Sequence, residues 1–199
     1  MKKTFNELHQ WLLQNWTAAR QLEDSMNEVQ DRYKTVCERV VEAVQEQKPE
    51  LNNCQRHFKR EGFHIAFARR EWPSQNERWP SGLWISNISL DNLMSEEGDP
   101  LYASIWLSIP KGIQVDLEKA RTRIQNAAAE LLKGEKLKCF FKDEPETCLW
   151  YTSPESRQAL AQMLLDDESE KFVECIVSHV MILARFIPVL DEILLKNRP

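Results

Sequence analysis

Glycine is scarce in this 199-residue chain, with five residues, and neither glycine nor proline occurs before Pro49. No apolar run approaches the roughly 20 residues that a bilayer-spanning helix needs, and polar residues interrupt any signal-like segment near the start. The five cysteines are odd in number and scattered, which argues against a disulfide framework. We therefore expect a helix-rich cytoplasmic protein with reduced thiols and no membrane partner.

Sequence signatures of catalysis are also missing. The chain contains no GxSxG motif, no glycine-rich phosphate loop, no HExxH and no CxxC pair. Possible metal ligands are Cys54 and His57 with His64, or Cys139 with Cys148 across a hairpin, but their spacing is unusual for structural zinc. We therefore predict no catalytic residue, no metal site and no cofactor.

The first 48 residues contain a seven-residue apolar repeat. If Phe5 is counted as an a position, the a and d positions as far as Ala43 are apolar, with Asn15 the single exception. Six heptads exceed the three or four that indicate a coiled-coil-like helix, and such a helix is roughly 60 Å long. We predict an assembly stripe composed of Phe5, Leu8, Leu12, Asn15, Leu22, Met26, Val29, Tyr33, Val36 and Val40.

Two interpretations of this stripe are open. It could pack within the chain against the C-terminal helix, since bundles and coiled coils share the same helix packing. It could also pair with another chain, because Pro188 interrupts the C-terminal helix and Trp11 and Trp16 widen the apolar face. Asn15 could specify register or partner, or lie where the helix end frays. The predicted domains are residues 1–48, the assembly element, and residues 49–199.

The second domain is predicted to be α+β. After the long helix ends near Gln47, Pro49 is placed to begin a short helix that runs through Phe58 and stops at Gly62. Alternating apolar residues then predict strands, and short connections without a βαβ rhythm predict an antiparallel sheet. About five strands are expected, near residues 63–67, 83–88, 101–109, 136–141 and 147–152.

Helices are predicted to pack on this sheet. Asp116 is a plausible N-cap for a helix that ends at Gly134, and residues 92–100 are predicted to form a polar loop. Ser153 is predicted to cap the next helix, with proline in its first turn. A final long helix should run from about Glu168 to Leu195, and Pro188 should bend or divide it.

Two further surfaces are candidate binding sites. Trp84, Tyr102 and Trp106 form an aromatic strand face that is either exposed for binding or buried as core. Basic residues interleaved with aromatic rings between positions 56 and 79 suit single-stranded nucleic acid, although three glutamates dilute the charge. The basic residues are Arg56, Lys59, Arg60, Arg69, Arg70 and Arg78.

Three functional hypotheses follow. The leading one is a non-catalytic cytoplasmic adaptor or assembly subunit that acts through protein–protein interaction, with a protein partner or a second copy on the N-terminal helix. The second is a nucleic-acid-binding accessory protein, although the net charge of −5 disfavours general attraction to nucleic acid. The third is an enzyme with an unrecognised site, because catalytic groups can converge from distant positions.

Overall fold

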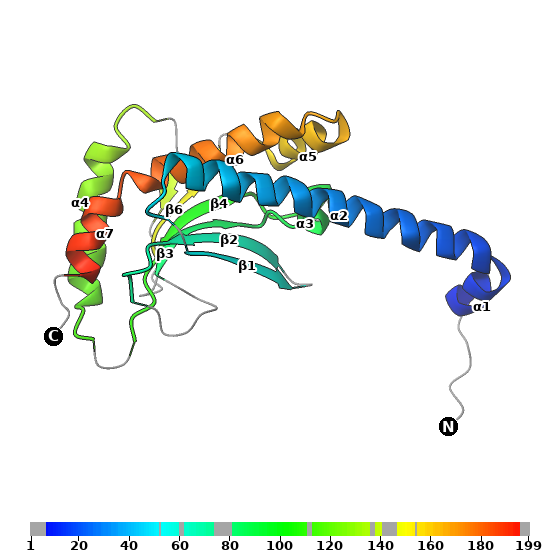
Figure 1. Ribbon diagram of the computed structural model, residues 1–199, viewed down its shortest axis with the longest axis horizontal. Helices are drawn as coiled ribbons and strands as arrows, with labels where there is room; N and C mark the ends of the chain where they lie inside the picture. Colours follow the sequence, from blue (N-terminus) through cyan, green and yellow to red (C-terminus); the bar gives the residue numbers. More distant parts are fainter. Residues whose placement is uncertain are drawn as a thin grey trace, which may run out of the picture. The chain divides into compact units, whose positions relative to one another are not determined.

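In the computed structural model (Figure 1), the chain divides into two compact units, unit 1 (Met1–Glu38) and unit 2 (Arg39–Pro199). The structure describes residues 7–51, 53–59, 62–73, 81–110, 113–135, 138–140, 147–153 and 155–195.

Two helices begin the described chain, α1 (Glu7–Gln14) and α2 (Trp16–Gln47). The end of α2 at Gln47 confirms the predicted end of the long helix. The predicted continuity is wrong, because the helix is interrupted at Asn15. The Asn15 Nδ2 and its backbone N–H both donate to the carbonyl of Trp11, each at 2.9 Å. Asparagine disturbs helices in this way because its side chain competes for backbone groups.

Unit 2 contains an antiparallel sheet with strand order β1-β2-β3-β4-β6-β5. Antiparallel pairing and the surrounding helices confirm the α+β class. The predicted number of about five strands is wrong, because the sheet has six strands in the described part of the chain. The central strands are β2, β3, β4 and β6, and β1 and β5 flank them. The bounds are β1 (Asn53–Lys59), β2 (Gly62–Ala68), β3 (Gly82–Ser86), β4 (Tyr102–Trp106), β5 (Lys138–Phe140) and β6 (Thr147–Thr152).

The short helix predicted after Pro49 is also wrong, because residues 53–59 form β1. Cys54 pairs with Phe67 and Phe58 pairs with Phe63 in the β1–β2 hairpin. A spacing of four residues places two side chains on one face of a helix, but it also places them on one face of a strand, since four is even. The two apolar residues were therefore compatible with both structures, and pairing with β2 decided between them.

One face of the sheet carries the core of unit 2. The register places Ile65, Ile85, Ala103 and Tyr151 side by side across β2, β3, β4 and β6, and all four are buried. Helix α6 (Ser169–Ala184) packs against β3 and β4. The side chains of α6 with no exposed surface are Phe172, Ile176, Val180 and Leu183, as the helical periodicity predicted.

Local capping fixes the other helices of unit 2. Helix α4 (Leu117–Leu131) has the predicted cap, because the Asp116 carboxylate accepts from the Lys119 N–H at 3.1 Å. Gly134, with φ of +90°, follows its end as expected. The predicted polar loop is partly wrong, because Ser89 caps a short helix there, α3 (Leu90–Met94).

The predicted start of the next helix is displaced by three residues. Helix α5 (Arg157–Leu165) begins after Ser156, whose hydroxyl oxygen accepts from the Ala159 N–H at 3.1 Å. Ser153 does not cap it, because its hydroxyl instead bonds to the carboxylate of Glu155 at 2.5 Å. Because α5 begins later than predicted, Ser153 and Glu155 lie in the non-helical connection between β6 and α5.

The C-terminal helix is divided as predicted. Helices α6 and α7 (Ile187–Leu194) meet at an angle of 49°, with Pro188 in the first turn of α7. Asp191 of α7 accepts a hydrogen bond from the Trp72 indole Nε1 at 2.8 Å and forms an ion pair with Arg69. In Figure 1, α7 lies beside α4, and the two helices are in contact.

Within the described residues, no single helix is both long enough and apolar enough to cross a membrane.

Candidate functional site

The predicted assembly stripe is exposed along most of unit 1. The exposed fractions are 61% for Leu8, 60% for Leu22, 56% for Met26 and 51% for Val29. Four other members of the stripe are partly exposed: Leu12, Asn15, Tyr33 and Val36. Val40, which belongs to unit 2, is buried, and Phe5 lies outside the described residues. Trp11 and Trp16 extend the same surface and are 50% and 61% exposed.

The exposed stripe includes a shallow groove of about 210 Å³. Its floor is apolar, and Glu23, Asn27 and Gln30 provide a polar edge. The apolar lining consists of Trp11, Leu12, Ala19, Leu22 and Met26. Scattered apolar residues are normal on a protein surface, whereas a contiguous apolar row with a polar edge is typical of an interaction site.

The aromatic strand face is less accessible. Trp84 is 3% exposed and lies 6.3 Å from the His64 ring in an edge-on contact. Tyr102 and Trp106 are partly exposed, and Ser104 between them is buried. The three predicted residues lie on one face of β3 and β4, but only the two on β4 present surface to a ligand.

The predicted nucleic-acid residues do not form one described cluster. Arg69 forms ion pairs with Asp191 and, at 3.6 Å, with Glu71, whereas Arg70 is exposed. Arg60 and Arg78 lie outside the described residues, and Arg56 and Lys59 lie on β1, whose side chains are not described. Arg69 therefore has a structural partner for its charge.

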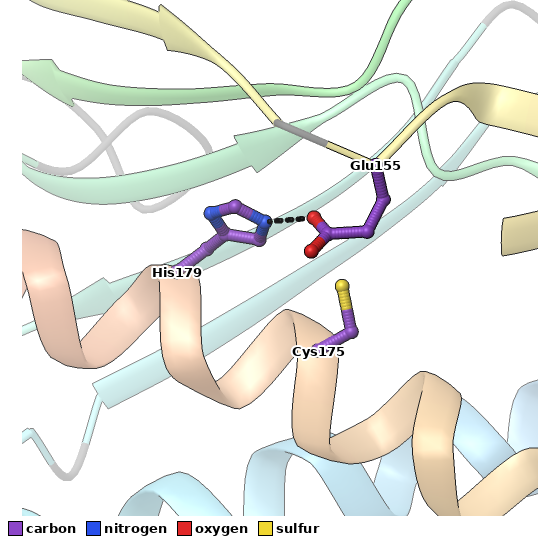
Figure 2. A group of neighbouring side chains, drawn as sticks. All are labelled: Glu155, Cys175 and His179. Atoms are coloured by element: carbon purple, nitrogen blue, oxygen red, sulfur yellow. Dashed lines mark hydrogen bonds and ion pairs between the residues drawn. The ribbon is translucent and has the colours of Figure 1, made fainter. Parts of the chain in front are cut away.

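A cluster that the sequence analysis missed lies beside α6. Cys175 and His179 are four residues apart, so they occupy one face of that helix. Glu155 comes from the connection between β6 and α5, and its carboxylate points toward both side chains (Figure 2). The sulfur of Cys175, a ring nitrogen of His179 and a carboxylate oxygen of Glu155 all lie within 4.8 Å of one another.

The orientation of His179 is fixed by its neighbours. The Tyr151 hydroxyl donates to the His179 backbone carbonyl at 3.0 Å, so its oxygen is the acceptor for the ring Nδ1–H, 3.2 Å away. The other ring nitrogen, Nε2, faces Ser153 Oγ at 3.0 Å and Glu155 Oε2 at 3.3 Å. His179 itself is 2% exposed.

The charges of the cluster follow from burial and contact. Burial lowers the pKa of His179, and the Glu155 carboxylate opposes that shift. Burial alone would raise the pKa of Glu155, but hydrogen bonds from Ser153 and the backbone, together with His179, bring it below its usual value. Burial and the adjacent carboxylate raise the pKa of Cys175 to about 12. The cluster therefore combines a carboxyl group, an imidazole ring and a thiol.

This geometry does not suit nucleophilic catalysis. In a serine triad the acid and the nucleophile contact opposite nitrogens of the histidine, whereas Ser153 and Glu155 both contact Nε2. Reactive cysteines need a lowered pKa, and that of Cys175 is raised.

A cation suits this set of donors better. Sulfur, imidazole nitrogen and carboxylate oxygen are the three ligand types that zinc takes in proteins. The spacing Cys-x-x-x-His in a predicted helix was the available sequence signal, but the third ligand comes from Glu155, twenty positions before Cys175.

Comparisons with protein-family models, with curated proteins and with solved structures find no match.

Proposed function

We propose that this protein is a non-catalytic cytoplasmic assembly subunit whose unit 1 binds a second copy of the chain. The observation that supports the proposal is the set of exposed apolar heptad positions, which are Leu8 on α1 and Leu22, Met26 and Val29 on α2. Burying a leucine-sized side chain contributes about 1.5–3 kcal/mol relative to exposure. A row of this kind is therefore a large source of association free energy.

The flanking positions favour a second copy as the partner. In a parallel, in-register pair, each g position faces the e position five residues later in the other helix. Within α2, Ala18 then faces Glu23, Ser25 faces Gln30 and Arg32 faces Cys37 across the interface. None of these three pairs places two like charges together. Two identical stripes can therefore meet without charge repulsion.

The cytoplasmic assignment rests on the thiols. Cys37 and Cys175 form no disulfide in the part of the chain that the structure describes, and disulfides are rare in the reducing cytoplasm.

The oligomeric state tests the proposal. The mass of the full chain should be measured by light scattering and by sedimentation over a wide dilution series. We expect the wild-type protein to be a dimer or larger and Leu22→Asp to be monomeric, because the substitution would bury an unpaired charge in the seam. Gln21→Asp is the matched control, since it adds the same charge one residue away on the outward side of α2; its mass should equal that of the wild type.

A monomeric wild-type chain at every concentration would overturn self-association. Equal masses for wild type and Leu22→Asp would show that the contact lies elsewhere on the molecule. Circular dichroism of both variants establishes that α2 is retained, so that loss of assembly is not loss of the helix.

A further inference from the structure

We infer that Glu155, Cys175 and His179 form a binding site for a zinc-type divalent transition-metal ion in unit 2. This site is separate from the exposed stripe and does not depend on the proposed assembly function.

The first support is that the three donor groups converge from two segments of unit 2. The His179 Nε2 and the Glu155 Oε2 lie 3.3 Å apart, and both also contact the Ser153 hydroxyl. The Glu155 carboxylate also faces the Cys175 sulfur (Figure 2). A divalent cation that replaced the protons shared by these groups would bind all three donors at once.

The second support is the spacing of the donor atoms. Tetrahedral zinc, with bonds of about 2.0–2.3 Å, requires its donors to be about 3.3–3.6 Å apart. The Glu155–His179 pair already has this separation, and all three donors lie within 4.8 Å of one another. A small change in side-chain torsion of Cys175 would complete the set, because it lies one helical turn from His179 on α6.

The third support is the surrounding shell. Metal-bound histidines usually donate their second ring N–H to an oxygen, which fixes the tautomer, and the Tyr151 hydroxyl oxygen is placed to accept that bond from His179 Nδ1. Ligating carboxylates are themselves hydrogen-bonded, and Ser153 and the backbone do this for Glu155. These partners surround His179 and Glu155, so the two side chains are already oriented for an ion.

The donor types define the class of ion. Magnesium and calcium prefer sites made only of oxygen, whereas thiolate with imidazole and carboxylate favours zinc and similar transition ions. On binding, the Cys175 thiol releases its proton to solvent and the sulfur takes up the metal bond. Three protein ligands leave a fourth position, which water can fill on the partly exposed Glu155 side.

The structural consequence is a cross-link. Glu155 belongs to the connection between β6 and α5, whereas the other two ligands belong to α6. A bound ion would tie these two segments together and stabilise unit 2, because the site does not exist in the unfolded chain.

The test uses the full chain with cobalt and zinc ions as probes. Cobalt(II) bound through a thiolate gives a sulfur-to-metal charge-transfer absorption, so we expect that band on titration of the wild type and its loss on addition of zinc. Zinc should also raise the melting temperature by roughly 5–10 °C when its free concentration exceeds the dissociation constant about 100-fold.

Glu155→Gln is the decisive variant, since it keeps every thiol and histidine of the chain. Loss of an outer-shell partner costs about 10–100-fold in metal affinity, so loss of this ligand should cost about 100-fold or more. Glu174→Gln is the matched control, because it removes an exposed carboxylate next to Cys175 on the same helix and should bind as the wild type does.

Absence of the charge-transfer band in the wild-type protein would overturn the inference without reference to any variant. Equal affinity of the wild type and Glu155→Gln would also overturn it, because the ion would then be held by other residues.

Discussion

The Asp191 carboxylate accepts a hydrogen bond from the Trp72 indole at 2.8 Å and forms an ion pair with Arg69, so one side chain of α7 holds two residues of the segment after β2. Trp72 is 5% exposed, and the side chains of Arg69 and Asp191 are each 26% exposed. The connection that follows β2 is thereby attached to α7. The ion pair of Arg69 therefore stabilises the fold of unit 2.

Replacing Asp191 should destabilise unit 2. Asp191→Ala leaves the Trp72 N–H and the Arg69 guanidinium without their shared acceptor, and hydrogen bonds to charged groups contribute about 1.5–3 kcal/mol. We expect the free energy of unfolding in urea to fall by about 2 kcal/mol. Glu71→Gln is the comparison, because the more exposed partner of Arg69 should contribute less than about 1 kcal/mol. Equal losses in the two variants would contradict a special role for Asp191.

The cap of α5 gives a second prediction. Ser156→Ala removes the acceptor for the Ala159 N–H, and loss of an N-cap costs about 0.5–2 kcal/mol. Ser156→Asp should retain most of the stability, because aspartate is also a good N-cap. Thermal unfolding of the three proteins measures the difference. If alanine and aspartate had the same effect, the hydroxyl would not act as the cap.

Hydrogen exchange gives a third prediction, concerning α2. The amides of residues 18–30 lie on a helix whose apolar face is exposed, and helical hydrogen bonds without tertiary packing open readily. We expect their protection to rise with protein concentration as copies pair, whereas protection in the buried helix α6 should stay constant. Protection of α2 that does not depend on concentration would contradict pairing through this segment.

The reactivity of Cys175 gives a fourth prediction. With a pKa of about 12 in the metal-free protein, roughly one part in 10⁴ of this thiol is ionised at pH 8, so alkylation should be slow. Glu155→Gln removes the negative charge that helps raise this pKa, so the same thiol should react faster in the variant. Mass spectrometry of the alkylated peptide, after treatment with a chelator, measures both rates. A slower reaction in the variant would show that the carboxylate does not act electrostatically on the sulfur.

Much of the fold could be predicted from local patterns. The Asp116 cap, the bend near Pro188 and the apolar face of α6 each depend on residues close together in the sequence, and each is present. One error arose where two structures share a pattern. Cys54 and Phe58 fit either a helix or a strand, and long-range pairing with β2 decided the outcome.

The Glu155–Cys175–His179 cluster could not be predicted in the same way. Ser153 and Glu155 resemble a helix start, and only the contacts with His179 of α6 give them another role. Those contacts depend on how α6 lies across the sheet, which is a property of tertiary packing. The spacing of Cys175 and His179 was visible, but a pair of residues on a helix face has little meaning without its third member.

The order of elements along the chain has a consequence for synthesis. All of the strands in the described part of the chain precede α6 and α7, which supply much of the buried apolar surface of unit 2. Roughly 140 residues separate the start of β1 from the end of α7, and at about 5–20 residues per second a growing chain needs roughly 7–30 s to make them. During that interval the apolar face of the emerging sheet lacks its covering helices. The nascent protein therefore passes through a stage that is open to chaperone binding and to aggregation.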